Sequence, residues 1–285
     1  SEYHAVLDTK AKQSEFSAFF VEPVQATAGY IIPPPEYFKK LKAILDRHGI
    51  LFVDDEIQMG MFRSGKLWAM EHFGVKPDMT VVEIWPGGGW YTEILAPYLR
   101  DKGQLYAAHF PVQTEVAFFK RFRQRFVDKL GAVPEVYDRV VISEFHPPSA
   151  VSAGPQAAAD RVLTFRNVHN WMKAGYAPEA FKTFASLLKP GGILGVVEHR
   201  AKPGTSEADM IESGYVTEAY VIELAQAAGL VLDGRAEINA NVKDTANHPA
   251  GVWSLPPSLR LKEQGRDKYL AIGESDRMTL RFRKP

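Results

Sequence analysis

A glycine-rich turn between an apolar strand and a helix is the feature that most constrains this chain. Residues 80–92 read Thr-Val-Val-Glu-Ile-Trp-Pro-Gly-Gly-Gly-Trp-Tyr-Thr. The apolar run predicts a strand that ends near Glu83, the glycines predict a tight turn, and a helix is expected next. Because glycine has no Cβ, a ligand can approach such a backbone closely, and this strand–turn–helix is typical of nucleotide-type cofactor sites.

The sequence after this turn alternates strand-like apolar runs with helical patterns. Such alternation predicts an α/β fold with a mostly parallel sheet. A Lys-Pro-Gly-Gly sequence at 189–192 predicts a sharp turn that stops one helix before the next strand. The predicted strands are 81–84, 104–109, 139–144, 159–165, 193–198, 230–236 and 277–283, and the main helices are 92–100, 116–130, 178–188 and 217–228.

Four segments carry a resemblance to class I S-adenosylmethionine (SAM) dependent methyltransferases. They are residues 83–98, 163–171, 188–200 and 280–285, and they are similar to a little-characterised bacterial group of predicted methyltransferases. The resemblance covers essentially all of 79–285. It implies a Rossmann-like sheet whose antiparallel edge hairpin comes last, SAM as cofactor, and direct transfer of its methyl group to a small-molecule acceptor.

The first motif of that family maps onto the glycine turn. Glu83 takes the acidic position, and Gly87 and Gly89 take the second and third glycines. Trp85 stands where the first glycine is usual, and Gly88 gives the turn compensating freedom. His109, at the end of the second strand, replaces the acid that normally meets the ribose, so we expect weaker SAM binding or help from a neighbouring residue.

Polar residues follow two other predicted strands, at the edge where ligands bind an open α/β sheet. Asn167 and His169 follow the strand 159–165, Glu198 ends the strand 193–198, and His199 follows it. We expect Asn167 and Glu198 to contribute to the cofactor site. Either histidine could act as a general base, because imidazole titrates near neutral pH. The alternative is that each of these residues is structural, and no metal site is predicted.

The first seventy residues predict a different unit. An apolar run at 18–24, a helical pattern at 37–48 and a second apolar run at 50–57 indicate a βαβ unit. Residues 16–78, with Val-Glu-Pro-Val-Gln, Asp-Arg-His-Gly-Ile-Leu and Arg-Ser-Gly-Lys-Leu-Trp-Ala-Met-Glu-His-Phe among the matching pieces, resemble class III (4-aminobutyrate-type) aminotransferases. In that family Asp55 would pair with the pyridinium nitrogen of pyridoxal phosphate (PLP), and Gln58 would contact its ring hydroxyl.

The lysine that would hold PLP is missing from its expected place. It should follow Asp55 by a few tens of residues, but no lysine occurs between Lys76 and Lys102. Without it there is no covalent attachment of the cofactor. We therefore expect no aminotransferase activity and interpret the chain as a chimera, with an aminotransferase-like segment at 1–78 and a methyltransferase domain at 79–285. We expect the βαβ piece to pack beside the larger sheet.

Composition narrows the classes of function. The formal net charge is zero, which argues against nucleic acid as the main partner, and no apolar run is long enough to predict a membrane span. Cysteine is absent, which excludes disulfides and thiolate catalysis. The first residues do not resemble a signal peptide, so we expect a cytoplasmic location. The leading hypothesis is a SAM-dependent methyltransferase; the alternative is a non-catalytic chimera in which neither site works, and the oligomeric state stays open.

Overall fold

The N-terminal βαβ prediction is confirmed in the computed structural model, which describes residues 18–21, 37–48, 51–54 and 76–285. Strand β1 (Ala18–Val21) pairs in parallel with β2 (Leu51–Asp54), and helix α2 (Tyr37–Arg47) connects them. The apolar side chains Leu41 and Leu45 of α2 are fully buried. Among the aminotransferase-type positions, Asp55 and Gln58 lie outside the described residues.

The chain divides into two compact units, Ser1–Ala69 and Met70–Pro285. Strands β1 and β2 form a two-stranded sheet, separate from the seven-stranded sheet of the second unit. The expectation that the first unit packs beside the second stays a prediction, and each unit is described by itself.

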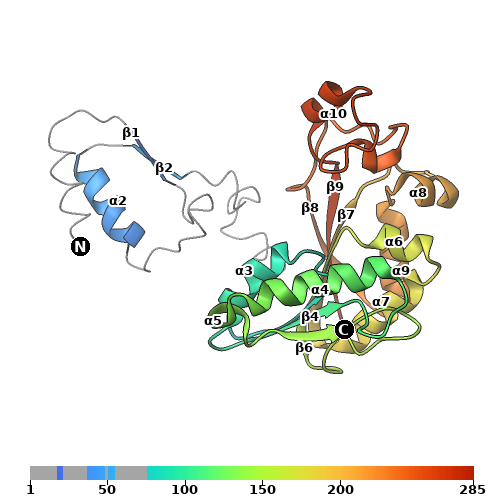
Figure 1. The fold of residues 1–285 in the computed structure, drawn as a ribbon, viewed down its shortest axis with the longest axis horizontal. Coiled ribbons are helices and arrows are strands. Elements are labelled where there is room, and N and C mark those ends of the chain that lie inside the picture. Colours follow the sequence, from blue (N-terminus) through green and yellow to red (C-terminus); the bar gives the residue numbers. More distant parts are fainter. Residues whose placement is uncertain (1–17, 22–36, 49–50, 55–75) are drawn as a thin grey trace. The chain divides into compact units, whose positions relative to one another are not determined.

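The second unit is built on one mixed sheet with the order β5-β4-β3-β6-β7-β9-β8 (Figure 1). The first five of these strands run parallel, whereas β9 lies between β7 and β8 and is antiparallel to both. This confirms the predicted Rossmann-like sheet with a late antiparallel hairpin. The bounds are β3 (Thr80–Ile84), β4 (Gln104–His109), β5 (Val141–Glu144), β6 (Ala159–Phe165), β7 (Leu188–His199), β8 (Val231–Ala236) and β9 (Arg277–Arg283).

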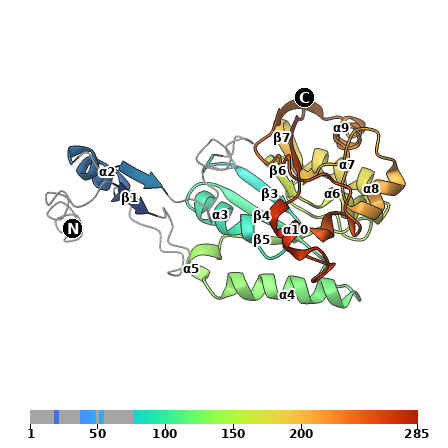
Figure 2. The same ribbon diagram turned by 90° about the horizontal axis from the view of Figure 1, so that it is seen from above.

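Helices cover both faces of this sheet (Figure 2). Neighbouring residues of a strand point to opposite faces, and β4 shows the consequence: Ala107 packs with Phe126 of one helix, whereas Ala108 belongs to the larger core on the other face, with Phe181 and Leu224. The helices are α3 (Trp90–Leu99), α4 (Ala117–Gly131), α5 (Pro134–Tyr137), α6 (Val168–Lys173), α7 (Ala177–Leu187), α8 (Glu207–Ser213), α9 (Glu218–Ala227) and α10 (Arg266–Ile272), with a 3-10 helix η3 (Gly251–Ser254). Within the described residues, no helix is long and apolar enough to cross a membrane.

The Lys-Pro-Gly-Gly sequence does not separate helix from strand as predicted. Helix α7 ends at Leu187, and β7 already begins at Leu188. The turn is instead absorbed as an irregularity within β7, because Leu188 lies opposite Ala159 and the next paired residue of β7, Ile193, lies opposite Arg161. Gly191 adopts a positive φ of 77° inside this irregularity, a conformation that costs glycine little.

The segment between β8 and β9, residues 237–276, is the largest insertion in the sheet and carries η3 and α10. A buried carboxylate holds it together. Asp244 accepts hydrogen bonds from the hydroxyl of Tyr215 at 2.9 Å, from Nε2 of His248 at 2.8 Å and from the backbone N–H of Asp276 at 2.8 Å. Because a buried polar group is tolerated only when it is hydrogen-bonded, this network joins the insertion to Tyr215, which follows α8.

Gly251 provides a test of that attachment. Its φ is +57°, and a Cβ built on it would overlap the backbone carbonyl oxygen of Ser213. Gly229, which follows α9, has a φ of +83° with no atom within 4 Å of such a Cβ, so Gly229→Ala is the matched control. A left-handed backbone conformation costs alanine about 1–2 kcal/mol, so we expect the control to lose about that much free energy of unfolding. Gly251→Ala should lose roughly 1–3 kcal/mol more than the control, because overpacking adds to the strain. Urea unfolding followed by tryptophan fluorescence measures both; equal losses would contradict the assigned contact.

Candidate functional site

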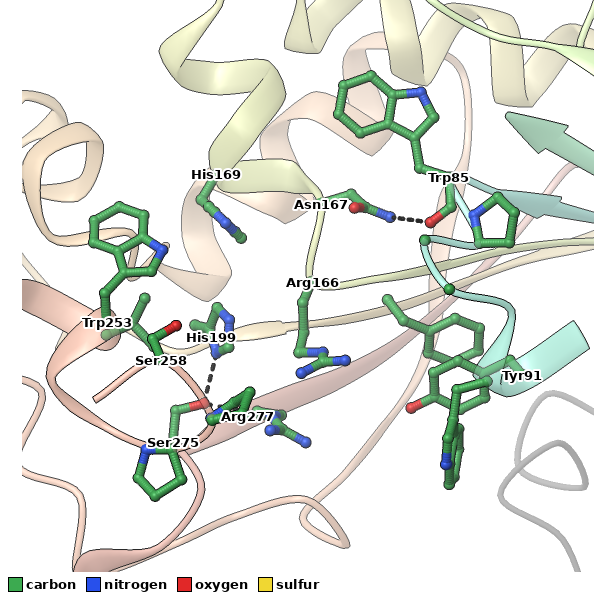
Figure 3. Close-up of a pocket in the computed structure, with 18 of the residues that line it drawn as sticks. Trp85, Tyr91, Arg166, Asn167, His169, His199, Trp253, Ser258, Ser275 and Arg277 are labelled. Atoms are coloured by element: carbon green, nitrogen blue, oxygen red, sulfur yellow. Dashed lines mark hydrogen bonds between the residues drawn. The ribbon is translucent and has the colours of Figure 1, made fainter. Parts of the chain in front are cut away.

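A cavity of about 330 Å³ opens where the parallel strands end. Its walls come from four places in the sequence: the glycine turn after β3, the segment after β6, the end of β7, and the insertion together with the start of β9. Figure 3 shows side chains from these segments facing one another. Parallel strands bring their carboxyl ends to one edge of the sheet, which is where α/β proteins bind ligands.

The glycine turn keeps its shape although tryptophan occupies the first glycine position. Trp85 adopts a φ of +51°, which is unusual for a bulky residue. Its indole N–H donates to the carbonyl of Phe145 at 2.7 Å, and its ring packs against Phe110 and Trp171 at centroid distances of 4.8 and 5.6 Å. These contacts offset the backbone strain. Gly87 and Gly88 line the cavity, whereas Gly89 ends the turn before α3 with a φ of 84°.

Glu83 lies at the cavity wall with one oxygen unpaired. Its side chain is buried, and its Oε2 accepts a hydrogen bond of 2.6 Å from the hydroxyl of Thr92. Its Oε1 is buried without a hydrogen-bond partner in the described structure. Burial raises the pKa of Glu83 to about 7, against the lowering effect of the Thr92 bond. An unpaired buried carboxylate oxygen is costly unless a ligand satisfies it.

His109 is not placed for the predicted ribose contact. It is fully buried and is not among the residues that line the cavity. Its Nδ1 accepts the backbone N–H of Phe110 at 2.8 Å, so Nε2 carries the proton and lies 3.2 Å from the carbonyl oxygen of Gly87. Burial, with a smaller contribution from Arg123, lowers the pKa of His109 to about 4, so the ring is neutral. His109 therefore ties the glycine turn to the end of β4.

Asn167 also connects two strand ends. Its side-chain amide nitrogen donates to the carbonyl of Ile84 at 3.0 Å and lies 3.2 Å from the hydroxyl of Thr164. Asn167 lines the cavity, and Figure 3 shows its side chain directed toward Trp85. The position of Asn167 thus agrees with the predicted cofactor contact. Because its amide nitrogen is bonded to the end of β3, the side-chain oxygen is the atom left for a ligand.

His169 and Glu198 form a buried pair. Nδ1 of His169 lies 3.0 Å from Oε1 of Glu198, and Glu198 also accepts the backbone N–H groups of His169 and His199 at 3.3 and 2.8 Å. Burial opposes ionisation of Glu198, but the side chains of His169 and His199 and the backbone N–H of His199 outweigh it and hold its pKa below the ordinary value. An ionised carboxylate only accepts hydrogen bonds, so His169 carries its proton on Nδ1.

This pair explains what the two predicted residues do. Glu198 does not line the cavity and lies behind His169, so it orients the imidazole instead of touching a ligand. His169 does line the cavity. With Nδ1–H held by Glu198, its Nε2 is the basic atom. The arrangement of a carboxylate that orients a histidine is the one used for general bases.

His199 lies beside this pair in a different state. Its Nδ1 is 2.5 Å from the hydroxyl of Ser275, and its ring centroid is 5.3 Å from that of His169. Burial, together with the positive charges of Arg277 and Arg166, lowers its pKa to about 3. Potential ligand atoms of His169, Glu198 and His199 lie within 4.8 Å of one another, a spacing that a metal ion could use. Glu198 already accepts three N–H groups, however, so the sequence prediction of no metal stays our interpretation.

Two arginines of the cavity were not among the predicted site residues. Arg166 directly follows β6 with a φ of +60°, and its buried Nε has no hydrogen-bond partner in the described structure. Arg277 opens β9; its Nε lies 3.3 Å from the hydroxyl of Ser275 and its Nη1 3.0 Å from Glu274. Arg166 lies in the segment 163–171, which resembles a methyltransferase motif, whereas no local sequence pattern connects Arg277 to the site.

A second cavity, of about 420 Å³, adjoins the first. The two share Trp85, Gly87 and Asn167 as lining residues. The second is largely aromatic, since Phe110 and Tyr176 line it together with three phenylalanines of α4, Phe118, Phe119 and Phe122. Both volumes lie in the range of small-molecule sites, so the glycine turn separates a polar compartment from an aromatic one.

Sequence comparison finds relatives of the N-terminal part among class III aminotransferases and an amino-acid racemase. The class III aminotransferase family matches residues 1–103. Over 73 residues the chain is 55% identical to the leucine/methionine racemase of Thermococcus litoralis, which covers 26% of this chain and 16% of that protein. Over 87 residues it is 37% identical to the 4-aminobutyrate aminotransferase of Escherichia coli (strain K12), with 30% and 20% covered. The chain spans a fifth or less of the length of these relatives.

Structural comparison finds solved proteins with the fold of the second unit. The [4+2]-cyclase SpnF superposes with a TM-score of 0.51 at 18% identity, covering 76% of this chain and 78% of that one. A Galdieria sulphuraria protein, provisionally named a sarcosine dimethylglycine methyltransferase, has a TM-score of 0.51 at 12% identity, with 75% and 82% covered. At such identities the likeness shows the fold alone. The chain therefore joins a sequence segment similar to class III aminotransferases to a Rossmann-like fold of the methyltransferase type.

Proposed function

We propose that the second unit binds SAM and transfers its methyl group to a small-molecule acceptor. The observation that carries this proposal is the buried Oε1 of Glu83, which has no partner and lies beside the glycine turn. A cation placed there would satisfy it. SAM, when bound, supplies a methyl group on a positively charged sulfonium, and it also carries an ammonium group. Either positive group could pair with the free carboxylate oxygen of Glu83.

The residues present fit this group on both sides of the turn. Gly87 and Gly88 leave room for a ligand, because no atom lies within 4 Å of a Cβ built on either. Glu83 and Asn167 offer polar contacts in the first cavity. The aromatic second cavity, with Phe110 and its neighbours, offers a stacking surface for a purine ring. The ribose acid usual in this fold is absent, so we expect affinity to depend on these contacts.

His169 is our candidate for the general base. Its Nε2 belongs to a residue that lines the cavity, and Glu198 fixes the ring from behind. Methyl transfer needs mainly the alignment of donor and acceptor. A base is required only when the acceptor carries a proton, and then Nε2 of His169 would accept it. His199 is a weak base at neutral pH, because its pKa is lowered to about 3.

Isothermal titration with SAM and with S-adenosylhomocysteine tests the proposal. We expect saturable binding by the full chain and its loss in Gly87→Asp, since that change brings a second acid and a side chain into a turn residue with a φ of 60°. Gly204→Asp is the control, because Gly204 also has a positive φ and open space but lies away from the cavity. If the wild type fails to bind either compound at millimolar concentration, the proposal is wrong.

That failure would favour the second hypothesis, a chimera without catalysis. Trp85 in the first glycine position and the inward-facing His109 are the observations on its side. A PLP enzyme stays the least expected activity, because no lysine occurs between Lys76 and Lys102, where the attaching lysine is expected. A visible absorption band after incubation with PLP would contradict this expectation.

A further inference from the structure

The first cavity contains two guanidinium groups and one carboxylate that face the same space. Arg277 is 9% exposed and Arg166 is half-buried. Of the described residues that line the cavity, Glu83 alone is acidic. Figure 3 shows Arg277 beside His199 and Ser275, and Arg166 between that group and Tyr91. The cavity is therefore divided in charge, with an acid at the glycine turn and cations elsewhere.

Arg166 is held at some cost without a protein partner for its Nε. Its left-handed φ of +60° is unfavourable for a long side chain, and Nε is buried without a hydrogen bond in the described structure. A buried donor without an acceptor costs free energy. An anionic ligand would supply the missing acceptor.

The neighbours of the two arginines add donors and no negative charge to the cavity wall. Ser258 presents a hydroxyl group, whereas the hydroxyl of Ser275 is bonded to His199. His199 stays neutral because burial and the nearby arginines oppose its protonation. Glu274 contacts Arg277 at 3.0 Å, but its side chain is 56% exposed and it does not line the cavity. Arginine forks bind carboxylates and phosphates through paired N–H bonds.

The position of Arg277 in the sheet separates it from the proposed cofactor turn. The glycine turn follows β3, and Arg277 begins β9, which lies three strands away in the order β3-β6-β7-β9. At a strand spacing of about 4.8 Å, this is roughly 14 Å. His169 follows β6, between the two. A group bound by Arg277 therefore lies on the far side of the base from the turn, where an acceptor belongs.

From this arrangement we propose that the acceptor is an anion, a small molecule whose carboxylate or phosphate is bound by Arg277 and Arg166. Its role as acceptor rests on the proposed function, whereas anion binding at this place does not. The bound anion anchors the acceptor with its remaining part toward Nε2 of His169. The arginines are thus specificity residues and take no part in proton transfer.

Succinate and inorganic phosphate are suitable probes, with succinamide as the uncharged counterpart of succinate. Binding is measured by isothermal titration and by tryptophan fluorescence at constant ionic strength, since Trp253 lines the cavity. We expect saturable binding of succinate or phosphate and none of succinamide. Which of the two anions binds more tightly identifies the group on the acceptor. Arg277→Leu should weaken that binding at least tenfold, Arg277→Lys less so, and Arg125→Leu, on the exposed face of α4, not at all.

Other outcomes overturn the inference. It is wrong if neither anion binds, or if Arg277→Leu and Arg125→Leu bind anions equally. It is also wrong if Arg277→Leu weakens SAM as strongly as it weakens the anion, because Arg277 would then serve the cofactor. Circular dichroism and thermal melting of each variant establish that it is folded. Anion binding without any SAM binding would keep the anion site and reject the proposed function, so the two failures are distinguishable.

Discussion

Replacing Glu83 by glutamine is expected to abolish the measurable binding of SAM and, at the same time, to remove a pH-dependent loss of stability. Burial raises the pKa of Glu83 to about 7, so the free protein carries this carboxyl group protonated in weakly acidic solution and ionised above neutrality. Only the ionised form attracts a cation. SAM affinity of the wild type should therefore rise with pH through about 7.

The effect of Glu83 on stability has the opposite sign. Between its unfolded pKa of 4.5 and its folded value of about 7, the folded chain binds more protons than the unfolded chain. The free energy of unfolding thus falls as pH rises through this window. With about 1.4 kcal/mol for each pH unit, the loss is on the order of 3 kcal/mol. Glutamine has the same shape without the charge and should not show it.

Urea unfolding of wild type and Glu83→Gln at pH 5 and pH 8 measures this effect. The pKa values of His109 and His199 are lowered to about 4 and 3, so these two residues destabilise the folded protein as pH falls below 6.5. Their effect on stability is opposite in sign to that of Glu83. Both histidines are present in both proteins, so their contributions cancel in the comparison. A wild type whose stability changes with pH in parallel with that of Glu83→Gln would contradict the assigned burial and protonation of this group.

Replacing His169 by alanine is expected to lower turnover by about 100- to 10,000-fold with an acceptor that carries a proton, because that is the usual contribution of a positioned base. The dissociation constant of SAM should stay unchanged. Glu198→Gln should lower turnover in the same direction, since a neutral amide no longer fixes Nδ1–H of His169 as firmly. Turnover is measured as S-adenosylhomocysteine released per chain.

His199→Asn separates this assignment from its alternative. His199 is bonded to Ser275 and its pKa is lowered to about 3, so its loss should matter less for proton transfer. If His199→Asn reduces turnover more than His169→Ala does, the bases are assigned the wrong way round. If both variants keep full turnover with such an acceptor, neither histidine is the base. A shift of the acidic limb of the kcat profile in Glu198→Gln would distinguish orientation of His169 from general stability.

The sequence predicts the sheet well because burial dictates strand composition. All seven strands of the second unit appear at the predicted places, including the late hairpin partner β9. The pattern at 189–192 predicts a separate turn, and the structure differs there. Pairing of Leu188 with Ala159, and of Ile193 with Arg161, extends the strand across the proline and the glycines. The pairing register of a strand depends on its partner strand, so a local sequence pattern cannot predict it.

The site is predictable only where it lies close to strand ends. Glu83, Asn167 and His169 line the cavity as expected from their positions. The side-chain directions of His109 and Glu198 were not predictable, because each depends on hydrogen bonds to residues distant in the sequence or to adjacent backbone. The arginine of β9 was missed for a similar reason: only the antiparallel pairing of β9 with β7 brings it beside His199.

The position of β9 inside the sheet has a consequence for synthesis of the chain. Strand β7 pairs with β6 on one side and with β9 on the other, yet β9 is made almost eighty residues after β7 ends. Until then, a strand whose residues Ile193 to His199 are all buried in the final fold offers an open, apolar edge. Such edges pair readily with other chains. We therefore expect the nascent chain to be most prone to pairing with other chains before β9 emerges from the ribosome.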